Sequence, residues 1–416
     1  MSVALRMLAL LLLQAVMLVA VASAQGTPQS LSLDSALRMF LERNPSVEVA
    51  RQQIEEARGR IDQAGRPHNP TLNFSQEGFP LGRSETGYDD QEFLFWASQR
   101  LELGGKRSRR RQEAVRGLEV QEAELNDWLR RGRARVARAF VRVHHLQAQQ
   151  RMAAALLGRY SQLNRIHQQR LQEGDVSGLS HLKIEAEEIR YRAALAQAET
   201  ALGRAWSELA SWLNWPGASL PRLQAPPVLK APLDSLDGLR QKALQTRPDL
   251  EAARARLLQA RAGLALQQAE GVPDLTLGGG FKRDFGQNSF YVGLQLPLPL
   301  FDRNQGAVAA AGARLEASRK DLEWLQIRIR REVEEAWRRL ELQREAAQRL
   351  GQTVGGKLER IVEVTQLSYA EGEADLLELL DAMRVELEAS LGLQELIMQA
   401  HLSRIDLEAA VGTRID

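Results

Sequence analysis

The sequence contains no cysteine and few aromatic residues, and neither sign of charge dominates. Aromatic residues make up 5% of its 416 residues, and the formal net charge is +2. Without cysteine the chain can form no disulfide, and thiolate metal ligands are excluded. A nearly balanced charge provides no general attraction to a polyanion. We therefore expect neither a disulfide framework nor a nucleic-acid partner.

Long apolar runs are also scarce, and one stands at the amino terminus. Arg6 precedes an apolar run over residues 7–21 that only Gln14 interrupts, and residues 22–24 read Ala-Ser-Ala. The run is short for a membrane span of about 20 residues, and its small-x-small end is typical of a signal peptidase site. We predict a signal peptide over residues 1–24, and hence export; an uncleaved anchor is the alternative.

Motifs that would carry catalysis or bind a cofactor are missing. The sequence contains no Gly-x-Ser-x-Gly elbow, no phosphate loop and no dinucleotide fingerprint. Its six histidines do not have ligand spacing; His144 and His145 are adjacent and would diverge by about 100° on a helix. We therefore expect no enzyme, no catalytic residue, no cofactor and no bound metal.

What the sequence does contain is a tandem duplication. Residues from the first half recur in the second half at one constant offset and without a gap. The recurring residues are Leu33, Asp34, Leu41, Pro45, Glu48, Ala50, Arg51, Ala57, Arg58, Pro70 and Leu72, which return as Leu236, Asp237, Leu244, Pro248, Glu251, Ala253, Arg254, Ala260, Arg261, Pro273 and Leu275. We predict a first repeat over 25–215, a Pro-rich linker over 216–232 and a second repeat over 233–416.

Each repeat begins with a helical seam that is followed by two segments of alternating polarity. Residues 47–66 and 250–270 carry apolar residues at spacings of three and four, the a and d positions of a heptad. The alternating segments cover 71–79, 91–103, 274–283 and 288–298. They are about ten residues long, as tilted transmembrane strands are. A soluble hairpin would look similar, but the export signal favours membrane strands.

Two very long helices then follow. Residues 105–173 and 304–371 contain no proline, and each stretch would span roughly 100 Å as one continuous helix. Gly174 and Gly372 supply the left-handed residue that a helix end prefers. Return helices are expected over 178–213 and 376–411.

Four strands cannot close a barrel in a membrane, because eight is the practical minimum and open edges are not tolerated in lipid. Several chains must therefore share one barrel, which the helices would continue as a tube. We predict a mainly α fold with a small β part, in which duplicated helical hairpins form an α-barrel tunnel and four transmembrane strands per chain enter a shared trimeric β-barrel.

The order of these elements resembles that of TolC-type outer-membrane factors, the outer membrane efflux protein family. Residues 103–107 (Leu-Gly-Gly-Lys-Arg) and 299–306 (Pro-Leu-Phe-Asp-Arg-Asn-Gln-Gly) are similar to the strand-to-helix junctions of its CzcC-like, heavy-metal-efflux branch. The resemblance covers essentially the whole mature chain. It implies a passive homotrimeric exit duct in the outer membrane, with a long periplasmic extension. It also implies a periplasmic adaptor and an inner-membrane pump as partners, and divalent heavy-metal cations as cargo.

The resemblance further implies a periplasmic gate. Residues 369–372 and 377–382 are similar to the family's periplasmic tip, where two acidic residues narrow the entrance. Glu378 and Asp381 stand at those positions, and Tyr369 matches a tyrosine that holds the tip closed. Ala374 stands where the family has a basic latch residue. The alternative is that the two carboxylates are ordinary solvent-exposed charges on a helix, without a role in a gate.

The turns at the ends of the long hairpins are expected to contact the adaptor. The residues concerned are Gly174, Asp175, Gly372 and Glu373. The runner-up function is a soluble periplasmic coiled-coil adaptor or scaffold, although adaptors add strand-rich domains that are missing here.

Two further features have structural interpretations. The basic run at 106–111 is expected to contact membrane headgroups or to form a solvated helix start. Trp206, Trp212 and Trp215 are expected to be packing residues.

Overall fold

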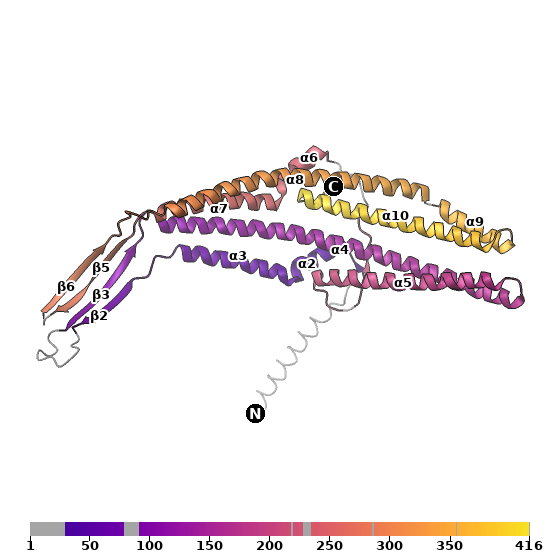
Figure 1. Cartoon of the computed structure of the whole chain (residues 1–416), viewed down its shortest axis with the longest axis horizontal. Coiled ribbons are helices and arrows are strands. Elements are labelled where there is room, and N and C mark those ends of the chain that lie inside the picture. Colours follow the sequence, from indigo (N-terminus) through magenta and orange to yellow (C-terminus); the bar gives the residue numbers. More distant parts are fainter. Residues whose placement is uncertain are drawn as a thin grey trace, which may run out of the picture. The chain divides into compact units, whose positions relative to one another are not determined.

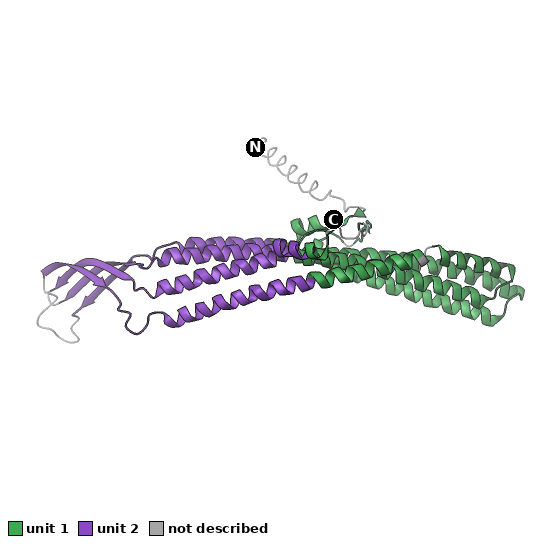
Figure 2. Cartoon of the chain, turned by 90° about the horizontal axis from the view of Figure 1, so that it is seen from above, with its two compact units in different colours: residues 1–47, 131–238, 333–416 green, residues 48–130, 239–332 purple. Residues whose placement is uncertain are grey.

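The computed structural model describes residues 30–78, 91–217, 219–227, 234–284, 287–354 and 356–415. The predicted signal peptide and the polar loop over 82–90 lie outside these residues. The chain divides into two compact units (Figure 2). Unit 1 contains residues 1–47, 131–238 and 333–416, and unit 2 contains residues 48–130 and 239–332. Among the described helices, none is long and apolar enough to cross a membrane.

Unit 2 carries a single antiparallel sheet. Its strands are β2 (Thr71–Glu77), β3 (Glu92–Leu101), β5 (Leu275–Asp284) and β6 (Gln287–Gln295), arranged in the order β2-β3-β5-β6 (Figure 1). Both predicted strand pairs form hairpins, and β3 joins them by pairing with β5. The described strands therefore leave β2 and β6 each with one neighbour.

The two faces of this sheet differ sharply. Directly paired residues project from the same face, so the register Phe74–Phe95–Phe281–Phe290 forms one apolar row. Val292 continues this face, and Phe290 and Val292 are 90% and 85% exposed. The opposite face is mostly polar. It includes Asn73, Ser75, Ser98, Lys282 and Ser289.

A tryptophan interrupts the polar face and explains the glycines of β5. A Cβ added at Gly278 would lie 2.6 Å from Trp96, and one at Gly280 would lie 2.5 Å from it. Contacts this close do not occur. At Gly278 only glycine leaves room for the indole, and at Gly280 only glycine leaves room for the neighbouring backbone, since a Cβ there would lie 2.1 Å from the Phe95 carbonyl oxygen. The Trp96 ring also meets Tyr291 edge-on, with the ring centroids 6.1 Å apart.

The seam helices form in both repeats, as predicted. They are α3 (Pro45–Ala64) and α7 (Pro248–Glu270), and Ile54, Ala57, Leu250 and Ala253 of the seam are buried. A shorter helix precedes each one: α2 (Leu33–Arg43) and α6 (Leu236–Thr246). The sequence analysis did not anticipate these. Pro45 and Pro248, which occupy the same position in the two repeats, mark the boundary between the short helix and the seam helix. Proline lacks an N–H and fits the first turn of a helix.

The first long helix is continuous and the second is broken. α4 (Lys106–Glu173) has 68 residues without interruption. The second stretch divides into α8 (Gln305–Val354) and α9 (Lys357–Glu371), so the prediction of one helix there was wrong. Gly356 has φ 79°, a left-handed conformation that glycine adopts without strain. The absence of proline was therefore not sufficient for continuity.

Unit 1 contains the return helices α5 (Gly178–Leu213) and α10 (Leu376–Val411). Buried Ala137 and Val141 of α4 pack with Ile405 of α10. Phe40 of α2 is fully buried, and a Cβ at Gly132 would lie 2.4 Å from its ring. The glycine therefore allows α2 to lie directly on α4.

The carboxyl end of α5 is held by aromatic packing, as predicted for the tryptophans. Trp212 meets Phe40 edge-on with ring centroids 6.0 Å apart, and Trp206 meets Trp215 at 5.4 Å. Part of the predicted linker is also ordered by pairing. β4 (Arg222–Leu223) lies parallel to β1 (Ser30–Leu31).

The basic run at the start of α4 is not simply solvated. Lys106 is buried, and its Nζ lies 2.7 Å from Asp274 Oδ1. Arg110 binds both carboxylate oxygens of Glu102, at 2.6 and 3.0 Å. We expected these two residues to contact membrane headgroups or to form a solvated helix start. That expectation is wrong, because each of them is paired with an acidic residue of the same chain. Arg107, Arg109 and Arg111 are exposed.

Candidate functional site: the hairpin tips

Both hairpin turns of unit 1 are built in the same way. At the end of α4, Gly174 has φ 84°, its N–H donates to the Leu171 carbonyl, and the Asp175 N–H donates to the Arg170 carbonyl at 2.9 Å. This pair of bonds is a Schellman motif, which satisfies carbonyls that a helix end would leave unpaired. Gly174 and Asp175 are exposed, so the turn offers its backbone and one carboxylate to solvent.

The second turn repeats this arrangement at the end of α9. Gly372 has φ 80°, its N–H donates to the Tyr369 carbonyl, and the Glu373 N–H donates to the Ser368 carbonyl at 2.8 Å. Gly372 and Glu373 are exposed. Ala374, in place of a basic residue, provides no charge at this turn.

Each return helix starts with a side-chain cap. Ser177 accepts a bond from the Ser180 N–H at 3.1 Å and caps α5. Asp375 accepts one from the Glu378 N–H at 2.8 Å and caps α10. Caps of this type contribute about 1 kcal/mol each. The signal for both was present in the sequence, since Ser and Asp are preferred immediately before a helix.

Glu378 and Asp381, the two carboxylates predicted to form a gate, lie on the exposed side of α10, but they are not equivalent. Asp381 forms an ion pair with Arg384, one turn further along the helix. The side chain of Glu378 has no ionic partner among the described residues. Both carboxylates are exposed. The charge of Glu378 is therefore not compensated by a described residue, whereas the charge of Asp381 is partly compensated by Arg384. Arg384 was not among the residues predicted from the sequence.

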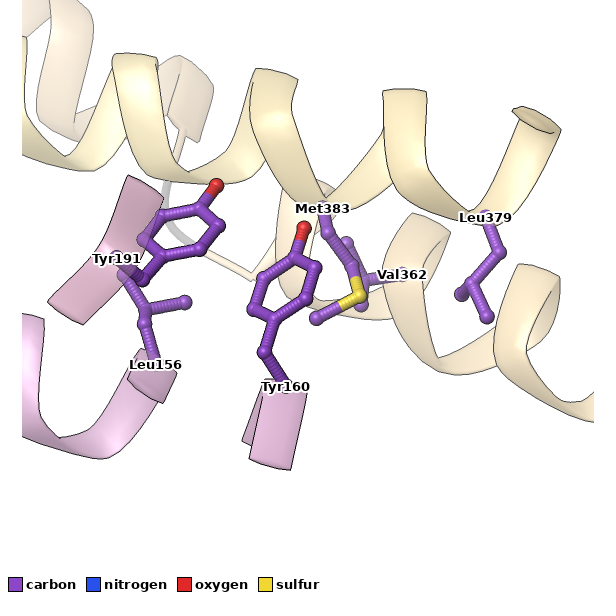
Figure 3. Packing of buried hydrophobic residues seen from close by; sticks show 6 residues of the cluster. All are labelled: Leu156, Tyr160, Tyr191, Val362, Leu379 and Met383. Atoms are coloured by element: carbon purple, nitrogen blue, oxygen red, sulfur yellow. The ribbon is translucent and has the colours of Figure 1, made fainter. Parts of the chain in front are cut away.

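The other side of α10 is anchored in a buried cluster. Leu379 and Met383 pack with Tyr160 of α4, Tyr191 of α5 and Val362 of α9. Figure 3 shows Met383 reaching toward Tyr160 from the opposite helix. The rings of Tyr160 and Tyr191 stack with their centroids 4.4 Å apart. The cluster contains residues of four helices, so it joins the two hairpin tips within unit 1.

Tyr369 lies at the edge of this cluster and makes a specific contact. Its hydroxyl is within hydrogen-bonding distance of His167 Nε2, and the two rings are nearly parallel with centroids 5.8 Å apart. His167 is on α4 and is 1% exposed. Burial raises the pKa of the Tyr369 hydroxyl, against the opposing influence of Arg170. The sequence could not reveal this pair, because 202 residues separate its members.

The described residues offer no obvious metal cage. Among them, no group of three or more His, Asp or Glu side chains is arranged to hold a metal ion. What this region provides is a hydrophobic joint between two hairpins, with acidic residues on its exposed side. Such an arrangement can keep the two hairpins together and present negative charge to solvent.

A two-faced sheet combined with paired long hairpins defines a class of channel-type outer-membrane proteins, and the comparisons with known proteins identify the family. The family model described as "Outer membrane efflux protein" matches residues 36–214 and again 239–413. The chain belongs to this family. It is accordingly an outer-membrane protein with a long periplasmic extension, and its fold is that of efflux channels rather than enzymes.

Individual relatives agree with this assignment. The chain is 27% identical over 385 residues to the cobalt-zinc-cadmium resistance protein CzcC of Cupriavidus metallidurans, covering 92% of this chain and 90% of CzcC. Its fold is similar to that of a membrane protein from Pseudomonas aeruginosa, with a TM-score of 0.77, 20% identity, and 92% and 90% of the two chains covered. It is also similar to the open MtrE outer membrane channel of Neisseria gonorrhoeae, with a TM-score of 0.72, 22% identity, and 92% and 89% covered.

Proposed function

We propose that the chain is the outer-membrane exit duct of a tripartite efflux system, a passive homotrimeric channel that exports divalent heavy-metal cations. An inner-membrane pump would supply the energy, and a periplasmic adaptor would join the pump to the duct. The observation that carries the proposal is the open sheet of unit 2, with one apolar exposed face and, among the described strands, an unpaired edge on each side.

The sheet supports a shared barrel on physical grounds. Unpaired N–H and C=O groups cost several kcal/mol each in hydrocarbon, so the outer edges of β2 and β6 need partners. A second copy can supply them, with β6 of one chain beside β2 of the next. Three copies would contribute twelve strands. The face containing Phe95 and Phe290 would be turned toward lipid, and the face containing Asn73 and Lys282 would be turned toward the lumen.

The domain division forms part of the proposal. We infer a signal peptide over 1–24, repeats over 25–215 and 233–416, and a Pro-rich linker over 216–232. The two segments matched by the family model, 36–214 and 239–413, support two repeats. The recurrence of short helix, seam helix, hairpin and long helix in each half supports the same division.

The hairpin tips are proposed as the periplasmic entrance. Tyr369, Glu378 and Asp381 would form the gate, and Gly174, Asp175, Gly372 and Glu373 would contact the adaptor. The exposure of both turns and their backbone geometry support an interaction role. Metal cargo is inferred from the name and similarity of CzcC.

The proposal is tested by expressing the full chain and fractionating the cells. We expect a heat-resistant trimer in the outer membrane, and loss of resistance to Co²⁺, Zn²⁺ and Cd²⁺ when its gene is deleted. A soluble monomer would instead support the adaptor or scaffold alternative. Loss of resistance to organic drugs with unchanged metal resistance would reject the cargo while keeping the duct.

A further inference from the structure

The contact between His167 and Tyr369 is a polar link between the two hairpins of unit 1, near their tips. His167 belongs to the hairpin formed by α4 and α5, and Tyr369 to the hairpin formed by α9 and α10. Their side chains meet through an oxygen–nitrogen contact and through ring stacking. Any movement that carries the second tip away from the first must therefore break this contact.

The environment of His167 disfavours its charged form. The imidazole is 1% exposed, and its Nδ1 is buried without a hydrogen-bond partner. Three polar groups face it: Arg170 on α4, His181 on α5 and Tyr369 on α9. The two charged groups that act on its pKa, Arg170 and His181, are both basic. Burial lowers the pKa of His167, and the nearby charges of Arg170 and His181 lower it further.

Protonation would change the chemistry of the contact. Neutral imidazole has one donor and one acceptor nitrogen, so Nε2 can accept from the Tyr369 hydroxyl or donate to it. Imidazolium has two donors and a full charge. Its Nδ1–H would remain buried without an acceptor, which is costly in a low-dielectric interior. Hydration relieves that cost only if the tips separate.

We propose that His167 is the residue that holds Tyr369 and keeps the two hairpin tips together, and that protonation of His167 releases this latch. The inference rests on the proposed function in one respect, that these tips form the entrance of the duct. It also accounts for how the tips are held when Ala374 stands where a basic latch residue would be expected. His167 is a positioning residue, since it acts through Tyr369.

The direction of the pH response follows from the linkage between protonation and opening. Because the closed state disfavours the charged imidazole, lowering the pH through and below the ordinary histidine value of about 6.5 favours the open state. Raising the pH restores the contact. The response should be reversible, because no covalent step is involved.

The experiment uses the full-length trimer in planar bilayers between pH 7.5 and pH 4.5. For the wild type we expect a several-fold rise in conductance as the pH falls. His167→Phe keeps an aromatic ring beside Tyr369 but cannot take a proton, and it should remain at low conductance at every pH. His167→Lys places an amine there that is charged at pH 7.5 when it is hydrated, so it should favour the open state at pH 7.5.

A matched variant tests the electrostatic part. His181→Gln removes a competing positive charge without touching Tyr369, so its opening should be kept and should move to higher pH. The latch is refuted if wild-type conductance does not depend on pH, or if His167→Phe responds as the wild type does.

Hydrogen exchange tests the latch independently of whether the chain forms a duct. Amides at residues 365–372 should exchange faster at pH 5 than at pH 7.5 after correction for intrinsic rates, and this difference should vanish in His167→Phe. If neither the wild type nor His167→Lys conducts at any pH, the proposed duct is refuted while exchange still decides the latch. Conductance with pH-independent exchange would refute the latch alone.

Discussion

Lys106 Nζ lies 2.7 Å from Asp274 Oδ1, and both side chains are almost completely buried. The pair joins the first residue of α4 to the residue before β5. Asp274 also accepts from the Leu103 N–H at 3.2 Å and from Arg100 Nε at 2.7 Å. One carboxylate therefore accepts from three donors, at the end of β3, in the connecting segment and at the start of α4, and it fixes that junction to the second repeat.

Breaking this pair should destabilise the protein. Lys106→Met leaves Asp274 buried without its lysine partner. Removing one member of a buried pair costs about 3–5 kcal/mol when the other charge is left unpaired, and the cost here should be smaller because Arg100 still pairs with Asp274. We expect the trimer to dissociate at a clearly lower temperature in detergent. Arg107→Met is the matched control, because the neighbouring side chain is exposed. Equal dissociation temperatures for the two variants would show that the junction does not depend on the pair.

The sheet makes a separate prediction about the membrane. Phe290→Arg and Val292→Arg place a charge on the proposed lipid face, where it costs about 2–4 kcal/mol at the bilayer midplane. The yield of outer-membrane trimer should fall for both. Tyr291→Arg, on the opposite face, should be tolerated much better. If all three substitutions were equally harmless, the shared barrel would have to be abandoned.

Patterns within a short stretch of sequence predicted much of this fold. The seam with Ile54 and Leu250 followed from spacings of three and four, and the strand pairs followed from alternation. These signals are local, because burying one face of a helix or strand requires apolar residues at the spacing of that helix or strand. The break at Gly356 also had a local signal, because glycine is unfavourable inside a helix even where proline is absent.

The contacts that define the candidate site could not be predicted from local sequence patterns. His167 and Tyr369 meet only because two hairpins pack together, and nothing in either segment specifies the partner. The burial of Lys106 was missed for the same reason, since a basic run next to a predicted membrane strand suggests headgroups until Asp274 is placed beside it. Only Arg384 could have been found, because it stands three residues after Asp381 on a helix.

The first hairpin turn can be tested by its backbone requirement. Gly174→Val forces a β-branched residue into a left-handed conformation, at a cost of about 1–3 kcal/mol. We expect metal efflux to fall while the amount of trimer holds, if the turn contacts the adaptor. Gly178→Ala is the control, because that glycine begins α5 and has open space around it. Full efflux by Gly174→Val would argue against adaptor contact at this turn.

The acidic residues of α10 lead to a graded prediction. Glu378→Ala should lower cation selectivity and weaken block by multivalent cations more than Asp381→Ala does, because Asp381 is already paired with Arg384. Arg384→Gln should act in the opposite direction and strengthen both properties. Reversal potentials of reconstituted trimers measure the three effects. Unchanged values in Glu378→Ala and Arg384→Gln would assign these charges to an ordinary solvated surface.

The histidines inside unit 1 predict how stability responds to acid. Burial lowers the pKa of His401 to about 4, with contributions from the charges of His144 and Arg404. In the unfolded chain this histidine has a pKa near 6.5. Between about pH 4 and pH 6.5 the unfolded chain therefore binds a proton that the folded chain does not bind. Stability from His401 is complete above pH 6.5 and is lost as the pH falls toward 4, by at most about 3 kcal/mol. Thermal dissociation of the trimer at pH 7.5, 5.5 and 4.5 should show this loss, and His401→Leu should show a shallower one. An equal slope in the wild type and His401→Leu would mean that another group controls the acid response.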